Sequence, residues 1–280
     1  MGLKVHHLNT ATLCTGTRKL INGKGSWLNP TGWLRKGQMV CHCLLIETAE
    51  GLVLVDTGFG LDDVSRGDLT RKLLLRSMGA MADPAECAIS QIRALGYQPD
   101  DVRHIILTHL DPDHAGGIKD FPRAQVHVHR REWEAAMNPA TTVESYRYQR
   151  HDWAHAPTWV THKENGERWN GFKLVRPLAE SLPEVLMIPL IGHSRGHCGV
   201  AVDTTDGWLL HCGDAYFNHT EVAGRKATPP PGIALLEAFT ETHREQRLDN
   251  LDRLRLLHRQ GGAKLICSHD PDEYHQCCGH

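Results

Sequence analysis

Short runs of apolar residues recur along the chain, each four to eight residues long and rich in Val, Ile and Leu. Runs of this length, separated by segments that contain Gly, Asp, Asn or Pro, are typical of β-strands. They form two groups, one before residue 130 and one after residue 170. The predicted strands are 4–8, 40–47, 52–56, 104–108, 125–129, 172–175, 185–191, 200–203, 208–212 and 264–267.

Two longer segments, 84–95 and 242–260, carry apolar residues at the spacing of an amphipathic helix. Asp83 followed by Pro84 is a typical helix start, and Gly follows the last turn of both segments. Helices of this kind cover one face of a sheet. The apolar positions are Ala85, Ala88, Ile89, Ile92 and Leu95 in the first, and Leu248, Leu251, Leu254 and Leu257 in the second.

The alternation of strands and helices predicts an α/β fold in which two sheets pack together with helices outside. No low-complexity linker divides the chain, so we expect one domain over 1–280. The segment 138–171 is rich in Trp, Tyr and His and shows no clear strand period. We interpret it as an insertion over a site, with a surface-packed α-hairpin without a ligand role as the alternative.

The composition limits the partners that we expect. The chain has 280 residues and a formal net charge of −2, which gives no positive field for nucleic acid or an anionic membrane surface. No apolar run reaches the roughly 20 residues of a membrane-spanning helix, and the N-terminus does not resemble a secretory signal. We therefore expect a cytoplasmic protein with a small-molecule substrate. The oligomeric state stays open, with a homodimer as one option.

The nine cysteines are an odd number, scattered through a chain that is long enough to fold without disulfides. Free thiols in a reducing compartment are the expected state. Several cysteines stand inside apolar runs, where a thiol behaves as a small hydrophobic side chain.

The segment HIILTHLDPDHAGG, residues 104–117, points to a metal site. An apolar run ends in His109, Asp111, Asp113 and His114, four ligand-type side chains within six positions. Histidine with carboxylates is a ligand set for Zn, Mn or Fe. A lone His or Asp at such a place is usually a surface residue or a turn-former, so the argument depends on the whole set.

Ligand-type residues also follow three later predicted strands. His193 comes after the run MIPLI, Asp214 after WLLHC, and His269 after LICS. Because strand ends at one edge of a sandwich converge in space, we expect these three side chains to join the earlier four. A site built from several loops at strand ends is a common arrangement.

These motifs resemble those of the metallo-β-lactamase superfamily of hydrolases, and the resemblance covers nearly the whole chain. It implies a four-layer αββα sandwich with a dinuclear metal site between the two sheets. The segments that carry it are VLVDTGFG at 53–60, THLDPDHAGG at 108–117, GHSRGH at 192–197, GDA at 213–215 and CSH at 267–269.

The resemblance also implies a role for each residue of the site. One divalent ion would be held by His109, Asp111 and His193, and the other by Asp113, His114 and His269, with Asp214 between them. Asp56 and His197 would support the ligand loops through hydrogen bonds instead of binding metal. Phe217 and Tyr216 follow Asp214 where related lactonases place an aromatic residue near the substrate, although packing is the alternative for both.

The chain departs from the family pattern at Asp111, where the superfamily has its second histidine. The motif is therefore HxDxDH. A carboxylate adds negative charge and hardness, so Mn or Fe stays open beside the two zinc ions that we expect. The change also argues against a true β-lactamase.

The resemblance implies a hydrolase in which a metal-bridging hydroxide attacks a carbonyl carbon. Asp113 would orient the hydroxide and carry its proton to the leaving group. The length, the N-terminal HHLNTATLC and the 138–171 segment are most similar to the lactonase branch. We therefore expect a lactone or ester substrate, such as an acyl-homoserine lactone, with 138–171 forming the acyl pocket.

Two alternatives stay open. A glyoxalase II-like thioesterase would need a basic patch for glutathione, for which 225–226 and the arginines of the last long helix are candidates. A flavodiiron-like redox or binding module uses a similar ligand set, but such proteins carry a flavin domain that this sequence does not show.

Overall fold

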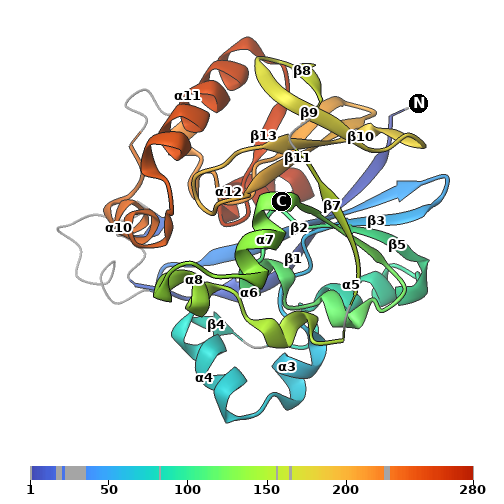
Figure 1. The fold of residues 1–280 in the computed structure, drawn as a ribbon, viewed down its shortest axis with the longest axis vertical. Helices are drawn as coiled ribbons and strands as arrows, with labels where there is room; N and C mark the ends of the chain where they lie inside the picture. Colours follow the sequence, from blue (N-terminus) through green and yellow to red (C-terminus); the bar gives the residue numbers. More distant parts are fainter. Residues whose placement is uncertain are drawn as a thin grey trace.

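Two β-sheets face each other in the structure, and helices cover the outer face of each sheet (Figure 1). The computed structural model describes residues 2–16, 21–22, 36–81, 83–155, 157–163, 166–223 and 228–279. The layers follow one another as helices, sheet, sheet and helices. This arrangement confirms the predicted α/β four-layer αββα sandwich.

The first sheet contains seven strands in the order β4-β1-β2-β3-β5-β6-β7. Strands β1 to β3 are antiparallel neighbours, whereas β3, β5, β6 and β7 run parallel. Residues that follow parallel strands meet at one edge of the sheet. The strands are β1 Lys4–Leu13, β2 Met39–Thr48, β3 Gly51–Val55, β4 Ala80–Met81, β5 Val102–Ile106, β6 Gln125–His129 and β7 Thr158–His162.

The second sheet contains six strands in the order β13-β12-β11-β10-β9-β8. Its strands are antiparallel neighbours except for β12 and β13, which run parallel. The strands are β8 Glu167–Trp169, β9 Phe172–Ala179, β10 Leu182–Pro189, β11 Cys198–Thr204, β12 Gly207–His211 and β13 Lys264–Ile266.

The central strands are apolar on both faces because each face is covered. On β2, Cys43 and Leu45 pack among the residues beneath the helices, whereas Leu44 and Ile46 pack between the sheets with Val200 of β11. Burying one such aliphatic side chain stabilises the fold by about 1.5–3 kcal/mol. Burial on both faces explains why these strands are nearly continuous apolar runs in the sequence.

Helices α5 and α7 cover the first sheet through Ile92 and Ala135, and α11 covers the second through Leu251, Leu254 and Leu257. Within the described residues, we find no helix with the length and apolarity to span a membrane. The helices are α3 Leu61–Arg66, α4 Leu69–Ser77, α5 Ala88–Ala94, α6 Pro112–Ala115, α7 Arg130–Met137, α8 Thr142–Arg147, α9 Thr220–Ala223, α10 Pro231–Thr240, α11 Arg244–Gln260 and α12 Pro271–Cys278.

All ten predicted strands are present, and α11 confirms the predicted helix at 242–260, ending at Gly261 with a φ of 66°. The prediction of a helix over 84–95 is wrong at its start, because α5 begins at Ala88. Asp83 instead accepts the backbone N–H of Ala85 at 2.9 Å and closes a turn before the helix.

The segment 138–171 contains α8, β7 and β8, so a simple α-hairpin does not describe it. Strand β7 extends the first sheet and β8 extends the second. Both are edge strands with one pairing neighbour each, which is why polar residues interrupt the strand pattern. Trp153 packs into the core beneath the helices of the first sheet.

All nine cysteines are free thiols, as predicted. Six of them are buried, namely Cys41, Cys43, Cys87, Cys198, Cys212 and Cys267. Most occupy apolar surroundings, in keeping with the role of a small hydrophobic side chain.

Candidate metal centre

Seven of the ligand-type side chains predicted from the sequence come together at one edge of the sandwich. The loop after β5 carries His109 and Asp111, and the short helix α6 carries Asp113 and His114. The other three follow the ends of β10, β12 and β13, and are His193, Asp214 and His269. Both sheets therefore contribute side chains to one buried group.

His109, Asp111 and His193 form the first part of this group. Asp111 Oδ2 lies 3.4 Å from His109 Nε2 and 3.3 Å from His193 Nε2. One potential ligand atom from each residue lies within 4.8 Å of the other two. The three side chains are thus arranged around one point.

Asp113, His114 and His269 form the second part, and Asp214 lies between the two. His269 Nε2 is 3.7 Å from Asp113 Oδ2 and 3.3 Å from Asp214 Oδ2. Asp214 Oδ1 is 3.4 Å from His114 Nε2, while Asp214 Oδ2 is 3.5 Å from His193 Nε2. Asp214 therefore contacts histidines of both parts.

Several buried polar atoms of this group lack a hydrogen-bond partner among the described residues. They are His109 Nε2, His114 Nε2 and Asp214 Oδ1. Leaving such atoms unpaired in the interior costs about 1–3 kcal/mol each. Imidazole nitrogens and carboxylate oxygens are the donors that divalent transition metals bind, so these residues fit a metal centre.

Three of the histidine rings are held with Nε2 toward the group by bonds at Nδ1. His269 Nδ1 donates to Val40 O at 2.8 Å, and His114 Nδ1 to Asp56 Oδ2 at 2.9 Å. His109 Nδ1 is 3.0 Å from the Thr108 hydroxyl. Bonds of this kind fix the tautomer and direction of a histidine that binds metal.

Asp56 links the DTG turn to the loop after β5. Its carboxylate accepts the backbone N–H and the hydroxyl of Thr108, both at 2.8 Å, in addition to His114 Nδ1. Burial opposes the ionisation of Asp56, but the charge of His114 and its hydrogen bond outweigh burial and lower the pKa of the carboxyl. Asp56 also has a φ of 56°, an unusual conformation for a non-glycine residue.

His197 has partners at both ring nitrogens. Its Nδ1 donates to Leu190 O at 3.0 Å, and its Nε2 accepts the backbone N–H of Asp214 at 2.9 Å. A Cβ at Gly213 would lie 2.5 Å from His197 Nε2, so only glycine permits this close approach. The ring therefore holds the loop that carries Asp214.

The electrostatics of the group favour bound cations. Burial, reinforced by the charge of Arg147, lowers the pKa of His193 to about 4, so its ring is neutral at pH 7. Burial opposes the ionisation of Asp214, but the charges of His269, His114 and His109 hold the pKa of this carboxyl well below its usual range. Burial opposes the protonation of His114 and His269, but the charges of Asp214 and Asp113 raise the pKa of both rings, so a cation that binds there would displace their protons.

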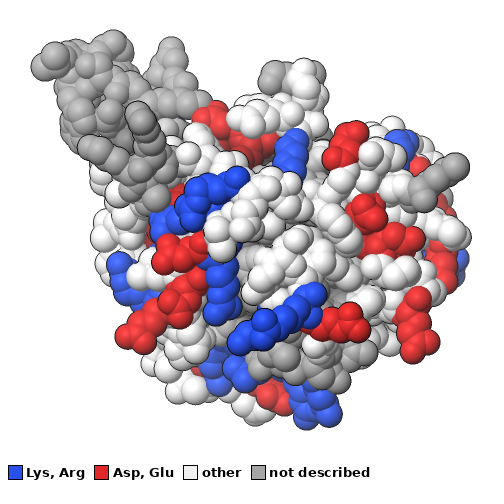
Figure 2. Space-filling view, turned by 90° about the horizontal axis from the view of Figure 1, so that it is seen from above, with Lys and Arg blue, Asp and Glu red and all other residues white. Residues whose placement is uncertain are grey.

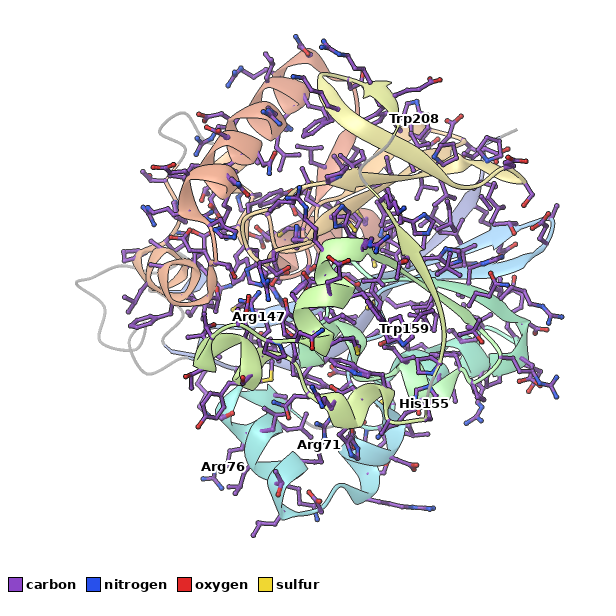
Figure 3. The ribbon with its side chains drawn as sticks, in the orientation of Figure 1. Arg71, Arg76, Arg147, His155, Trp159 and Trp208 are labelled. Atoms are coloured by element: carbon purple, nitrogen blue, oxygen red, sulfur yellow. The ribbon has the colours of Figure 1, made fainter. Side chains whose placement is uncertain are left out.

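Arg147 at the end of α8 is a residue of the site that the sequence motifs did not identify. Its Nε lies 3.3 Å from Asp111 Oδ1, and its side chain is 6% exposed. It also donates to His193 O at 3.0 Å and to Thr240 O, and Figure 3 shows where it leaves α8. Burial opposes the ionisation of Asp111, but Arg147 holds the pKa of this carboxyl well below its usual range.

Glu132 on α7 is a second such residue, because it joins two ligand loops. Its carboxylate accepts the backbone N–H of Leu110 at 3.1 Å and that of Gly196 at 2.9 Å, together with the Ser194 hydroxyl at 2.7 Å. The side chain is fully buried. One carboxylate thus spaces the loop of His109 from the loop of His193.

We expect Glu132→Gln to lower the free energy of unfolding by about 1–3 kcal/mol, because the amide cannot accept all three bonds. Denaturant unfolding of the metal-free protein measures this loss. Glu134→Gln is the matched control, since Glu134 lies on the same helix with its side chain 51% exposed. Equal stability of the two variants would contradict a linking role for Glu132.

A cavity of about 270 Å³ opens beside the group. Its walls come from the N-terminal strands, the end of α4, the loop after β12 and α10. Besides the ligand-type side chains, the lining residues include Leu13, Met39, Met78, Phe217, Leu236 and Thr240. The walls are thus largely apolar.

Two expectations about this cavity need correction. Phe217 lines it, but Tyr216 points into the core of the second sheet, where its hydroxyl donates to Glu273 at 2.9 Å. No described residue of 138–171 is part of the lining. Tyr148, Trp153 and Trp159 pack with the core beneath the helices of the first sheet, whereas Trp169 packs against the core of the second sheet. Arg147 is the contribution of the segment to the site.

The basic residues considered for glutathione include two that the structure does not describe. Residues 225–226 lie outside the described residues, and no arginine of α11 is part of the lining. Figure 2 shows acidic and basic side chains interspersed over one face of the molecule, so neither sign dominates that face.

Helix α10, which lines the cavity, is anchored by buried carboxyl groups. Glu237 accepts Arg247 Nη1 at 3.0 Å, and Arg247 also lies 3.9 Å from Glu221. Burial, followed by the charge of Glu221, raises the pKa of Glu237 to about 9. The folded protein therefore keeps a proton that the unfolded chain releases near its usual pKa of 4.5.

This retained proton predicts a pH dependence of stability. Because the folded state binds more protons between about pH 4.5 and pH 9, we expect its stability to fall as the pH rises through this range. Glu237→Gln removes the titrating group, so its free energy of unfolding changes less with pH. Denaturation at several pH values measures the slope, and parallel curves for the two proteins would contradict the assignment.

The comparisons with known proteins agree with this geometry. Residues 37–269 match the family model of the metallo-beta-lactamase superfamily. A probable metallo-hydrolase of Mycobacterium tuberculosis is 42% identical over 277 residues, covering 97% of this chain and 82% of the relative. An N-acyl homoserine lactonase of Bacillus thuringiensis is 31% identical over 237 residues, covering 84% and 83%.

A solved structure of an N-acyl homoserine lactone hydrolase with its product N-hexanoyl-L-homoserine at the catalytic metal centre has the same fold. The TM-score is 0.71 and the identity 22%, with 99% of this chain and 97% of that chain covered. The family match covers most of the chain and includes the whole group of ligand-type residues. The chain therefore belongs to the metallo-beta-lactamase superfamily and is a metal-dependent hydrolase.

Proposed function

We propose that the protein hydrolyses a lactone, or a related ester, at a centre of two divalent metal ions. The observation that carries this proposal is the set of unpaired buried donors around Asp214, which contacts histidines on both sides. One ion would be held by His109, Asp111 and His193, and the other by Asp113, His114 and His269. Asp214 would bridge them.

Two ions held in this way would supply a hydroxide at neutral pH and polarise the carbonyl oxygen of the substrate. The chain contributes the remaining steps. Asp113 lies at the cavity wall, where its carboxylate can hold the proton of the nucleophile and pass it to the leaving alkoxide. Phe217 and the apolar walls position the substrate and exclude water.

The donor set supports zinc as the resident metal. Histidine nitrogens with a small number of carboxylates are typical zinc ligands. Asp111 makes the first position harder, which keeps Mn and Fe as alternatives. Arg147 Nε lies 3.3 Å from Asp111 Oδ1 and offsets the negative charge that Asp111 adds. The net charge of the Asp111–Arg147 pair is therefore close to that of a neutral histidine ligand at this position.

The cavity supports a small apolar substrate. Its walls of Leu13, Met39, Met78, Phe217 and Leu236 suit an acyl chain. The relative from Bacillus thuringiensis, 31% identical to this chain, is an N-acyl homoserine lactonase, which makes such lactones the leading substrate class. A glutathione thioester ranks second, because no Lys or Arg side chain is part of the described lining.

The discriminating experiment follows proton release with a pH indicator. Metal-replete protein is mixed in parallel with an N-acyl homoserine lactone, an S-acyl glutathione and a bis-aryl phosphodiester. We expect acid release with the lactone, abolished by a chelator and restored by zinc. Turnover of the thioester alone, or no lactone turnover with two ions bound per chain, would refute the proposed substrate class.

A further inference from the structure

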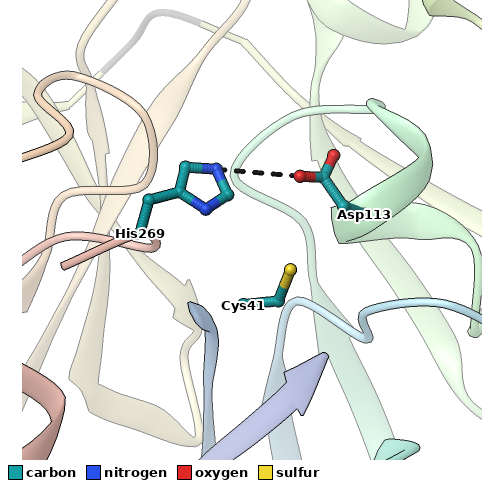
Figure 4. A group of neighbouring side chains, drawn as sticks. All are labelled: Cys41, Asp113 and His269. Carbon is teal, nitrogen blue, oxygen red and sulfur yellow. Dashed lines mark ion pairs between the residues drawn. The ribbon is translucent and has the colours of Figure 1, made fainter. Parts of the chain in front are cut away.

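Cys41 lies among the proposed metal ligands, although no motif includes it. It stands on β2 and is 2% exposed. Its Sγ, an oxygen of Asp113 and a ring nitrogen of His269 all lie within 4.8 Å of one another. Figure 4 shows the thiol pointing into the space between the Asp113 carboxylate and the His269 ring.

The spacing of these atoms suits a shared ion. Asp113 Oδ2 and His269 Nε2 are 3.7 Å apart. Zinc bonds of about 2.1 Å at a tetrahedral angle place two such donors roughly 3.4 Å apart. A Zn–S bond is slightly longer, about 2.3 Å, so a sulfur ligand tolerates a somewhat wider spacing from the other two donors.

Cys43, two residues further along β2, provides a contrast. It is 1% exposed and packs in the core beneath the helices, with its Sγ 3.3 Å from the Thr10 hydroxyl. The side-chain hydrogen bonds found at Cys41 reach its backbone instead, through Asn9 at its N–H and Thr10 at its C=O. The Cys41 sulfur is therefore the thiol of β2 that faces the carboxylate and the imidazole.

We propose that Cys41 is an additional ligand, giving a thiolate sulfur to the ion held by Asp113, His114 and His269. The thiol would lose its proton to solvent as the metal binds. Thiolate is a soft donor, whereas the Asp111 carboxylate is hard, so the two positions would differ in metal preference. The position beside Cys41 would favour zinc or cobalt over manganese.

X-ray absorption at the zinc edge tests this ligand directly. We expect a Zn–S shell at about 2.3 Å in the zinc-loaded protein and in Cys43→Ala, and its loss in Cys41→Ala. Cobalt-loaded protein should show the matching sulfur-to-cobalt charge-transfer band in the near ultraviolet. Competition with a chromophoric chelator should show zinc binding weakened at least about tenfold in Cys41→Ala alone.

The matched variant separates ligation from packing, because both substitutions remove one buried thiol from the same strand. A zinc-loaded protein without a Zn–S shell, or a shell that persists in Cys41→Ala, would overturn the proposal. The inference rests on the proposed metal centre and not on the lactone substrate. Failure to bind zinc would refute the proposed metal centre and the Cys41 ligand together. Bound zinc with only nitrogen and oxygen neighbours would refute the Cys41 ligand alone.

Discussion

Asp113→Asn should lower kcat for lactone hydrolysis by about 10²–10⁴-fold. Asparagine has the shape of aspartate, but its amide cannot take the proton of the nucleophile and return it to the leaving group. Asp113 lies at the cavity wall, with its Oδ2 3.7 Å from His269 Nε2 and 3.8 Å from His114 Nε2.

The measurement combines steady-state kinetics with metal analysis of each variant. A loss in kcat with little change in KM and two ions still bound would assign the proton transfer to Asp113. Asp62→Asn is the control, since Asp62 is exposed on α3. Unchanged turnover would refute the role, and a variant that binds one ion would assign the loss in kcat to the missing ion instead of to proton transfer.

Arg147→Met should destabilise the metal-free protein by about 3–5 kcal/mol. The substitution keeps an apolar stem of similar length but leaves the Asp111 carboxylate without its buried partner at 3.3 Å. His193 O and Thr240 O also lose their donor. Arg150→Met is the matched control, because Arg150 is an exposed arginine three residues further along the chain.

Denaturant unfolding, with and without zinc, measures this effect. A bound ion would compensate the Asp111 charge, so zinc should raise the stability of Arg147→Met more than that of the natural protein. The double variant with Asp111→Asn should recover part of the loss, since no carboxylate then stays unpaired. A loss of stability in Arg147→Met as small as that in Arg150→Met would contradict the ion pair between Arg147 and Asp111.

The sequence predicted the parts of the site that follow strong strands. His109, His193, Asp214 and His269 each come directly after an apolar run, and the common edge of the sheets brings them together. The same runs predicted the ten strands of the two sheets, because burial on both faces leaves an uninterrupted apolar signal.

The missed residues have no such local signal. Arg147 and Glu132 act through partners far along the chain, such as Thr240 and Gly196, so neighbouring residues do not indicate their role. Cys41 lies inside an apolar run, where its thiol is indistinguishable from a core side chain in the sequence. Edge strands β7 and β8 escaped prediction because polar residues interrupt them.

Tyr216, whose hydroxyl donates to Glu273, is a second case in which the sequence alone does not show the position of a side chain. Residues that follow one another in a turn point in different directions, and the sequence does not decide which one faces the cavity. The structure directs Phe217 to the cavity, 4.9 Å from the ring of His269, and Tyr216 to the core.

The distribution of the ligand-type residues over both sheets has a consequence for the order of folding. His109 to His114 belong to the half of the chain that builds the first sheet, whereas His193, Asp214 and His269 belong to the half that builds the second. Neither half alone supplies all the ligands of either proposed ion. The complete metal centre would therefore form only after the two halves of the chain dock. The bound ions would then slow the separation of the two halves during unfolding.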